Sequence, residues 1–399
     1  MTETAHAPRT APQAESAAGR VSGAALRICL AHPNPGPECE TFIRAHIRGL
    51  SGVHAVLHGG HMALRDTADN VLHPGLPQEP AQLFSPSGKA ETQTHGQAAM
   101  NMARFLRSGR TDVVLAQYGP TGVALLPACR EAQIPLVAHF HGYDASLCPV
   151  LAKYAAGYAA LFEHAAAVIA VSQEMRQDLL RLGAPEDRLH VIPYGVDASM
   201  FTAASPQDAP PRFVSVGRFV DKKAPETVLA AFAAVHADIP DATLVMLGDG
   251  VLRPACIRLA ACLGVAHAVS FPGAVSHDEV AQAMRGARCF VQHSVTAPTG
   301  DKEGTPNAVL EAAASGLPVV ATYHAGIREA VVHEHTGLLC HEHDAATMAD
   351  HMRRMARSPA LAAALGAAGR AHVQACYDRE RQLAALTQVL QAAVQETPR

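Results

Sequence analysis

The sequence lacks three features that would each place it in a large class of proteins. Its nine scattered cysteines form no C-x-x-C pair, so neither a zinc ribbon nor a disulfide framework is indicated. No Lys/Arg run stands out and the net charge is -4, which argues against the basic face of a nucleic-acid-binding protein. No apolar run reaches the roughly 18 residues that a bilayer span needs. We therefore expect a cytoplasmic protein in a reducing setting, with no nucleic-acid partner.

What the sequence does contain is material for two ordinary globular domains. The chain has 399 residues, of which 49% are hydrophobic and 17% charged. Residues 1–23 are rich in Ala, Pro, Thr and Ser without an apolar core, and we predict a disordered tail rather than a signal peptide.

Short apolar strands alternate with helical stretches along the chain. This alternation is typical of parallel, doubly wound sheets. A stretch rich in Pro, Ala and Asp, residues 197–212, interrupts it, and the alternation then restarts. The fold class predicted is α/β with two tandem Rossmann-like domains. The boundaries predicted are a first domain at 24–200, a linker at 201–212, a second domain at 213–375 and a C-terminal helix at 376–399, which we expect to pack back on the first domain.

The stretch EGTPNAVLEAAASGLPVVAT, Glu303–Thr322, reads as loop, helix and strand. Thr305 is the expected N-cap with Pro306 in the first helical position. The amides of Asn307 and Ala308 would then point out of the helix end, where a phosphate binds readily.

Two carboxylates flank this helix end. Glu311 lies about 7–8 Å along the helix, on the scale of a phosphate-to-ribose distance, and a carboxylate is a good acceptor for a diol. Glu303, in the preceding loop, is placed to bind a second set of hydroxyls. Together they match a sugar–diphosphate–nucleoside. The alternative is a capping acid in the loop and a solvated helix glutamate.

Two further loops follow apolar strands, where ligands bind in open α/β sheets. VSVGRFVDKKAPE offers Arg218, Lys222 and Lys223 as cations for a diphosphate, or else forms a solvated basic loop. VAHFHGYDAS places His139, His141, Gly142 and Asp144 at the end of a strand. They are either ordinary polar loop residues or include a histidine that bonds a sugar hydroxyl.

Two other patterns carry little weight. LGDGVLR has Arg253 where the third glycine of a dinucleotide fingerprint belongs. HEHTGLLCHEHD, residues 333–344, gathers His and Cys, but the spacing matches no standard zinc pattern and we interpret it as a solvated loop.

These motifs together resemble a family 4 retaining glycosyltransferase of the GT-B fold, nearest the branch that builds bacterial exopolysaccharides such as colanic acid. The resemblance covers most of residues 25–395 and is strongest in the second domain, through VGRFVDKKAPE, LGDGVLR, FPGAVSHDEV, the E-x7-E stretch and HTGLL. It implies two Rossmann-like domains facing each other across a cleft, and a nucleotide-sugar donor, with UDP as the expected nucleotide.

The resemblance also implies roles for individual residues. Glu303 corresponds to the acid beside the donor sugar and Glu311 to the acid on the ribose. Arg218 and Lys223 correspond to the pair that binds the diphosphate, and His141 to a histidine near the reacting face of the sugar. The remaining donor contacts implied are Gly304, Thr305, Asn307 and Ala308.

Four positions depart from the family pattern. Ala224 and Ala325 stand where glycine is usual, Cys39 where serine is usual, and Arg328 where proline is usual. None of the four removes a charged catalytic group.

The function expected is transfer of a hexosyl unit, with retention, to a saccharide or lipid-linked saccharide. No metal or other cofactor is expected, since the protein supplies the cations. The alternatives are a nucleotide-sugar epimerase or hydrolase, and a non-catalytic nucleotide-sugar-binding subunit. A helix at 97–110 with Arg104, Arg107 and Arg110 offers a peripheral contact with the inner face of the plasma membrane, but a core-facing amphipathic helix is favoured.

Overall fold

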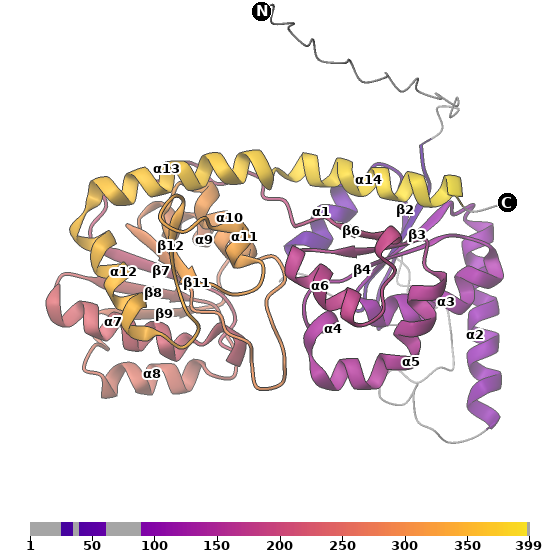
Figure 1. The fold of residues 1–399 in the computed structure, drawn as a ribbon, viewed down its shortest axis with the longest axis horizontal. Coiled ribbons are helices and arrows are strands. Elements are labelled where there is room, and N and C mark those ends of the chain that lie inside the picture. The colour runs from indigo at the N-terminus through magenta and orange to yellow at the C-terminus, as the bar shows by residue number, and fades with distance from the viewer. Residues whose placement is uncertain (1–24, 35–39, 61–88, 397–399) are drawn as a thin grey trace, which may run out of the picture.

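The computed structural model describes residues 25–34, 40–60 and 89–396, without the side chains of 89–95. Figure 1 shows two lobes side by side, each built from a sheet with helices on its faces. The predicted tail at 1–23 and the Cys39 departure lie outside the described residues.

The first lobe holds a six-stranded parallel sheet in the order β2-β1-β3-β4-β5-β6. Its central strands are apolar runs buried on both faces, as expected of a sheet covered by helices on either side. The strands are β1 Ile28–Ala31, β2 Val53–Leu57, β3 Val113–Gln117, β4 Leu136–His139, β5 Ala167–Ala170 and β6 Leu189–Val191. The helices are α1 Thr41–Gly49, α2 Lys89–Ser108, α3 Gly119–Ala132, α4 Tyr143–Ser146, α5 Cys148–His164 and α6 Gln173–Arg181.

The second lobe repeats this architecture in the order β12-β11-β10-β7-β8-β9, again all parallel. The strands are β7 Arg212–Val216, β8 Thr243–Leu247, β9 Val269–Gly273, β10 Cys289–Val291, β11 Val319–Thr322 and β12 Gly337–Cys340. The helices are α7 Pro225–Asp238, α8 Arg253–Cys262, α9 His277–Arg285, α10 Asn307–Ala314, α11 Ile327–Ala330 and α12 Ala345–Arg357. The doubly wound α/β fold predicted from the alternation is therefore confirmed.

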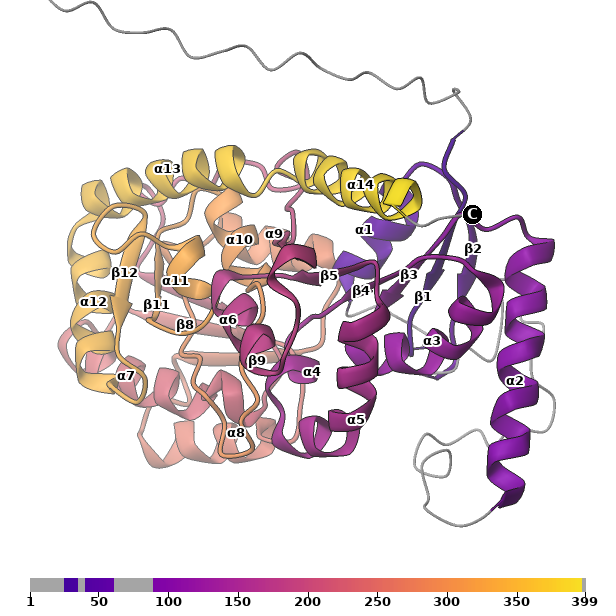
Figure 2. The same ribbon diagram turned by 45° about the vertical axis from the view of Figure 1, so that its right-hand side comes forward.

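Two long helices run across both lobes (Figures 1 and 2). α13, Pro359–Cys376, packs on the second lobe, and α14, Arg379–Glu396, packs on the first. Leu383, Leu386 and Leu390 of α14 are buried in one apolar cluster with Ile28 and Leu30 of β1. Residues 377–378 separate the two helices.

The chain passes between the lobes twice, first near Val196 and again at residues 377–378, and the two passages lie against each other. The amide of Val196 donates to the carbonyl of Tyr377 at 2.8 Å, and the amide of Arg379 donates to the carbonyl of Val196 at 3.3 Å. Val196 and Asp378 form an isolated parallel bridge. The two crossings are therefore joined by backbone hydrogen bonds. No domain boundary is tested by this arrangement, and those given above stay predictions.

α2 bears on the proposed membrane contact. Met102, Ala103 and Leu106 on one face of the helix are buried in the core of the first lobe, while Arg104 and Arg107 are exposed. One face of the helix is apolar and buried and the other is charged and exposed, as in a core-facing amphipathic helix. Within the described part of the chain, no helix combines the length and the apolarity needed to cross a membrane.

Candidate active site

The helix end singled out in the sequence lies where the two lobes meet. α10 begins at Asn307, and the amides of Val309 and Leu310 both donate to the carbonyl of Pro306. The residue preceding the helix is therefore Pro306, and the predicted N-cap at Thr305 is wrong. The Thr305 hydroxyl instead donates to the carbonyl of Val171 in the first lobe, which removes it from the helix end.

That helix end keeps donors available on its axis. Among the described residues, the backbone amides of Asn307 and Ala308 donate no hydrogen bond. The Asn307 side chain makes a 3.4 Å contact from Nδ2 to Oγ1 of Thr41, at the start of α1. The end of α10 and the start of α1, from different lobes, therefore lie against each other, with anion-binding amides between them.

Glu303 is paired with Lys223 at 2.9 Å between Oε1 and Nζ, and its side chain is only 9% exposed. Burial opposes the charged form, but the ammonium groups of Lys223 and Lys222 lower the pKa of Glu303 to about 2. The carboxylate is therefore ionised throughout the neutral range. Its pairing brings together two residues that are 80 positions apart in the chain and that the sequence predicted for one site.

The other two cations of the basic loop have different surroundings. Lys222 is buried and its Nζ donates to Oδ1 of Asp301 at 3.0 Å and to the carbonyl of Lys302 at 3.1 Å. Arg218 is exposed and, with Lys223, lines a small hollow after β7. Lys222 thus fastens the loop that carries Glu303, whereas Arg218 is left facing solvent near Lys223.

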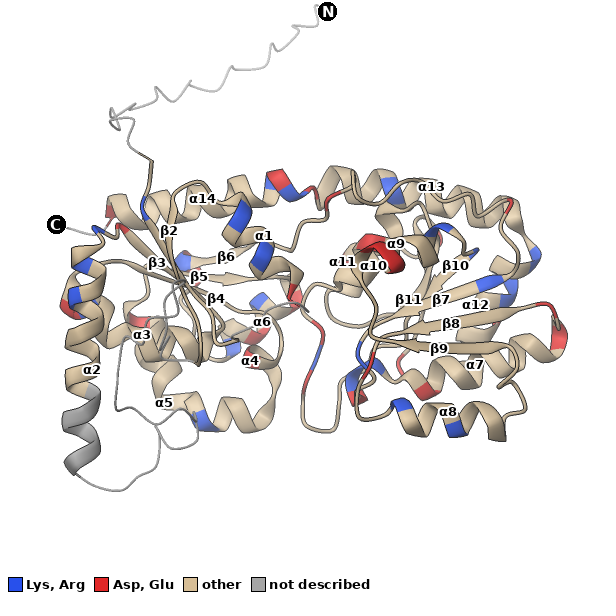
Figure 3. Ribbon diagram, turned by 180° about the vertical axis from the view of Figure 1, so that it is seen from behind, with Lys and Arg blue, Asp and Glu red and all other residues tan. Residues whose placement is uncertain are grey.

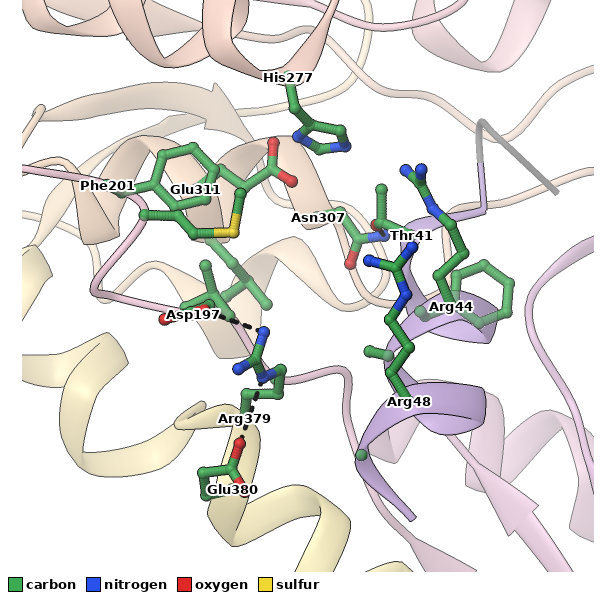
Figure 4. A pocket seen from close by; sticks show the side chains of 17 residues that line it. Thr41, Arg44, Arg48, Asp197, Phe201, His277, Asn307, Glu311, Arg379 and Glu380 are labelled. Atoms are coloured by element: carbon green, nitrogen blue, oxygen red, sulfur yellow. Dashed lines mark hydrogen bonds and ion pairs between the residues drawn. The ribbon is translucent and has the colours of Figure 1, made fainter. Parts of the chain in front are cut away.

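Glu311 lies on the opposite flank of the helix end, half-buried on α10. Burial raises its pKa to about 7, because the carboxylate has lost water without gaining a cation. It lines a cavity of about 580 Å³ between the lobes. Figure 4 shows Arg44 and Arg48 of α1 on the side of this cavity opposite Glu311, with His277 at the start of α9 above them.

Sequence reasoning missed the contribution of α1 to this cavity. Arg44 and Arg48 are four residues apart on one helix and so share a face. At the base of the cavity, the guanidinium of Arg379 is paired with Asp197 at 2.9 Å and with Glu380 at 3.4 Å. The spacing of the two α1 arginines was the signal available in the sequence. Their placement opposite Glu311 depends on how the lobes meet, and Figure 3 shows charged segments of both lobes at that boundary.

His141 has both ring nitrogens engaged within the first lobe. Nδ1 lies 2.7 Å from the Tyr194 hydroxyl and Nε2 lies 2.7 Å from Oε1 of Gln117. The ring lies against Phe42, with centroids 4.4 Å apart and the two planes tilted by 32°. Burial, followed by the neighbouring His139 and His46, lowers the pKa of His141 well below its ordinary value. The imidazole is therefore neutral, and in this structure it is held by protein partners.

Asp144 organises the loop that carries His141. Its carboxylate accepts hydrogen bonds from the amides of Gly119, His141 and Gly142, each at 2.9 Å. Burial raises the pKa of Asp144 to about 6, although these three amides favour the charged form. Asp144 thus shapes the backbone of the loop through three amide donors that all belong to the first lobe.

The loop carrying Glu303 is pressed against the first lobe. The Nζ of Lys302 pairs with Glu174 at 3.2 Å and with Asp178 at 2.7 Å, both on α6. A Cβ added at Gly304 would lie 2.5 Å from the carbonyl oxygen of His141, so only glycine permits this approach. The lobes are therefore closed on each other at this loop.

Two of the departures from the family pattern coincide with unusual backbone. Ala224 has φ 33° and Ala325 has φ 39°, in the left-handed region that favours glycine. A third departure, Arg328, pairs with Glu174 at 3.2 Å. The structure thus explains why glycine would suit the first two positions, which here accept alanine at some cost in strain.

The His-rich segment at 333–344 is only partly a solvated loop. Gly337–Cys340 form β12, which is fully buried beside β11. Within the described ranges, no group of three or more His, Cys, Asp or Glu side chains is placed to hold a metal ion. The interpretation as a loop is therefore wrong for these four residues, whose apolar run was the signal of a buried strand.

Comparisons with known proteins agree with this geometry. Residues 199–372 match the model for glycosyl transferases group 1, and residues 64–200 match the model for glycosyltransferase family 4. One relative is WcaL of Salmonella typhimurium, whose name describes a colanic acid biosynthesis glycosyltransferase. It is 31% identical over 62% of this chain and 62% of its own length. The chain thus spans about three fifths of the length of that relative. AmsK of Erwinia amylovora, an amylovoran biosynthesis glycosyltransferase, is 28% identical over 70% of each chain.

Among solved structures, the fold is shared with Alr3699/HepE of Anabaena, crystallised with UDP and glucose. The TM-score is 0.71 at 19% identity, over 92% of this chain and all of that one. A glycosyltransferase from Rickettsia africae gives a TM-score of 0.72 at 16% identity, over 93% of this chain and 99% of the other. At these identities the likeness concerns the fold. The likeness shows the GT-B fold, and the two family models identify residues 64–200 as a glycosyltransferase family 4 region and residues 199–372 as a group 1 glycosyl transferase region.

Proposed function

We propose that this protein is a retaining glycosyltransferase that moves a hexosyl unit from a nucleotide diphosphate sugar to a saccharide or lipid-linked saccharide, in the synthesis of a polysaccharide. UDP is the nucleotide we propose. The observation that carries the proposal is the N-terminal end of α10, which is flanked by two carboxylates whose pKa values are shifted in opposite directions. Glu303 is ionised beside Lys223, and Glu311 has its pKa raised to about 7.

The donor would lie along this helix end. Its diphosphate would accept from the amides of Asn307 and Ala308, while the ribose hydroxyls donate to Glu311 and the sugar hydroxyls to Glu303. WcaL and AmsK are named for polysaccharide synthesis, and HepE was crystallised with UDP and glucose. These names support a nucleotide-sugar donor and a saccharide acceptor.

The cations would stabilise the diphosphate as it leaves the sugar. As the bond between the anomeric carbon and the diphosphate breaks, negative charge grows on the leaving oxygen. Lys223 and Arg218 would stabilise that charge, which lowers the barrier because the interaction is strongest in the transition state. In this structure the Lys223 ammonium already pairs with Glu303. Donor binding would therefore place Lys223 between two anions, and would bring the sugar beside Glu303.

The acceptor hydroxyl would attack from the face that the diphosphate leaves, which gives retention. The closed contact between the lobes would exclude water and so limit hydrolysis of the donor. The proposal also places the protein in the cytoplasm, where nucleotide sugars and lipid-linked acceptors meet. No metal or further cofactor is part of the proposal, since Lys223, Arg218 and the helix end provide the positive charge.

A thermal-shift panel with UDP, GDP, ADP, NAD, UDP-glucose and GDP-mannose tests the donor class. A ligand that binds only the folded state raises Tm by mass action, and no acceptor need be known. We expect a shift with UDP and a UDP-sugar. A shift with GDP and GDP-mannose alone would change the nucleotide, and silence across all the nucleotides would refute the proposal. Donor consumption in the absence of any acceptor would instead indicate an epimerase or hydrolase.

A Glu303→Gln variant tests the catalytic assignment. It should lower turnover about 100-fold or more, because a positioned charged partner of the sugar is lost, and leave the Kd for free UDP nearly unchanged. Full activity in this variant would remove Glu303 from the mechanism.

A further inference from the structure

Two side chains outside the proposed donor site hold the loop that carries Glu303. The backbone amide of Glu303 donates to Nε2 of His324 at 3.2 Å. On the other side of the imidazole, Nδ1 of His324 lies 2.7 Å from Oε1 of Glu342. His324 follows β11 and Glu342 follows β12, so the two ends of adjacent strands reach the loop together.

The second oxygen of Glu342 fastens the other end of the same loop. The backbone amide of Thr296 donates to Oε2 of Glu342 at 2.9 Å. One carboxylate therefore fixes the loop at Thr296 directly and at Glu303 through His324. Between these points the loop makes its contacts with the first lobe, through Thr299 and Lys302.

The hydrogen bonds also fix the state of the imidazole. A backbone amide can only donate, so Nε2 of His324 must be the accepting nitrogen. Nδ1 then carries the proton and donates it to the Glu342 carboxylate. The His324 ring is 1% exposed, so water cannot replace either partner. Only a neutral imidazole of this one tautomer satisfies both neighbours.

We propose that Glu342 and His324 are positioning residues, which set where the Glu303 carboxylate stands relative to Lys223 and the donor sugar. The inference rests on the proposed function of Glu303. It also gives a role to Glu342, one of three acidic residues in the His-rich segment at 333–344, which no part of the donor site uses. A shift of about 1 Å in a positioned catalytic group lowers turnover about 100-fold, so the loss of this anchor should be visible in kcat.

The test uses the full chain with four substitutions. His324→Leu removes the acceptor for the Glu303 amide, and His324→Gln restores it by placing Oε1 near the position of Nε2. Glu342→Gln keeps the size of the side chain but offers one accepting oxygen to two donors. His351→Leu is the matched control, because His351 is also a buried histidine of the second lobe, bonded only to the carbonyl of Leu339, at 3.2 Å, among the described residues.

Hydrogen–deuterium exchange at the amides of Thr296 and Glu303 gives a readout that needs no substrate. The Glu303 amide should exchange about 10-fold or more faster in His324→Leu and at the wild-type rate in His324→Gln and His351→Leu. Both amides should exchange faster in Glu342→Gln. Unchanged protection of Glu303 in His324→Leu would overturn the inference.

Steady-state release of UDP from UDP-glucose, or of GDP from GDP-mannose, in the presence of a saccharide or lipid-linked saccharide acceptor that the wild type uses, gives the second readout. The nucleotide is chosen by its effect on wild-type Tm. We expect kcat to fall about 10- to 100-fold in His324→Leu, to recover in His324→Gln, and the Kd for the free nucleotide to stay unchanged. Equal losses of kcat and nucleotide affinity, shared by His351→Leu, would overturn positioning in favour of general destabilisation. A wild-type protein whose Tm shifts with neither nucleotide would instead count against the proposed function, and the exchange experiment would still decide whether the anchor exists.

Discussion

Glu311 makes the stability of this protein depend on pH in the direction opposite to that of a salt-bridged carboxylate. Burial raises its pKa from 4.5 to about 7. Between these two values the folded state keeps a proton that the unfolded chain has already lost. The free energy of unfolding must therefore fall as pH rises through this window, and level off above about pH 7. Glu303, with its pKa lowered to about 2, has the reverse effect, and only below about pH 4.5.

The size of the Glu311 effect follows from the shift. At about 1.4 kcal/mol for each pH unit, the rise corresponds to about 3 kcal/mol of stability lost between pH 4.5 and pH 8. A Glu311→Gln variant carries no titrating group at this position and so lacks this loss. The stability of the variant relative to the wild type should therefore increase by about 3 kcal/mol over that range.

Urea denaturation of both proteins at pH 5, 6, 7 and 8 measures this difference, and groups that titrate elsewhere cancel in the comparison. The same pair of proteins tests the ribose contact. Hydroxyl donors favour the carboxylate, so binding of UDP near pH 7 should release part of a proton, which calorimetry in buffers of different ionisation enthalpy detects. Glu311→Gln should show no such release. Denaturation curves whose separation is the same at every pH would refute the reasoning.

Two further changes test the electrostatics and the closed contact. Lys223→Met leaves the Glu303 carboxylate buried beside fewer cations and should destabilise the protein by about 3 kcal/mol. The loss should be smaller in the double variant with Glu303→Gln. Simple additivity of the two changes in a double-mutant cycle, measured by urea denaturation, would contradict the pairing. Gly304→Ala places a methyl group 2.5 Å from the carbonyl oxygen of His141, so the lobes should separate at this loop. We expect a larger radius of gyration in X-ray scattering and turnover lowered about 100-fold, while UDP still binds. An unchanged scattering curve would show that the close contact between Gly304 and His141 is not required.

Much of the fold could be predicted because buried parallel strands are recognisable in the sequence as apolar runs. One strand that was missed is β12. In β12, four buried residues sit inside a His-rich segment, and the composition of the flanks concealed a short apolar run. The break between α13 and α14 depends on a contact between distant parts of the chain, because it lies where Val196 forms backbone hydrogen bonds with Tyr377 and Arg379.

The candidate site was predictable as far as local rules determine it. The amides at the start of α10 and the carboxylates on its two flanks follow from helix geometry and spacing. Thr305 was assigned to the wrong task because its hydroxyl has a partner, the carbonyl of Val171, on another lobe. The anchor formed by His324 and Glu342 could not be found in the same way, since it depends on two strand ends and a loop meeting in space.

The placement of α14 has a consequence for the order in which the protein can fold as it is made. The first lobe begins the chain, yet the helix that covers Ile28 and Leu30 of β1 comes from residues 379–396. During synthesis the strands and helices of the second lobe have all emerged before this helix exists. The lobe that starts first is therefore completed after the second, and until then one apolar face of its sheet is covered by α1 but lacks Leu383, Leu386 and Leu390 of α14. A fragment that ends near residue 200 would leave that face only partly covered, and we expect it to aggregate unless a peptide of residues 379–396 is supplied.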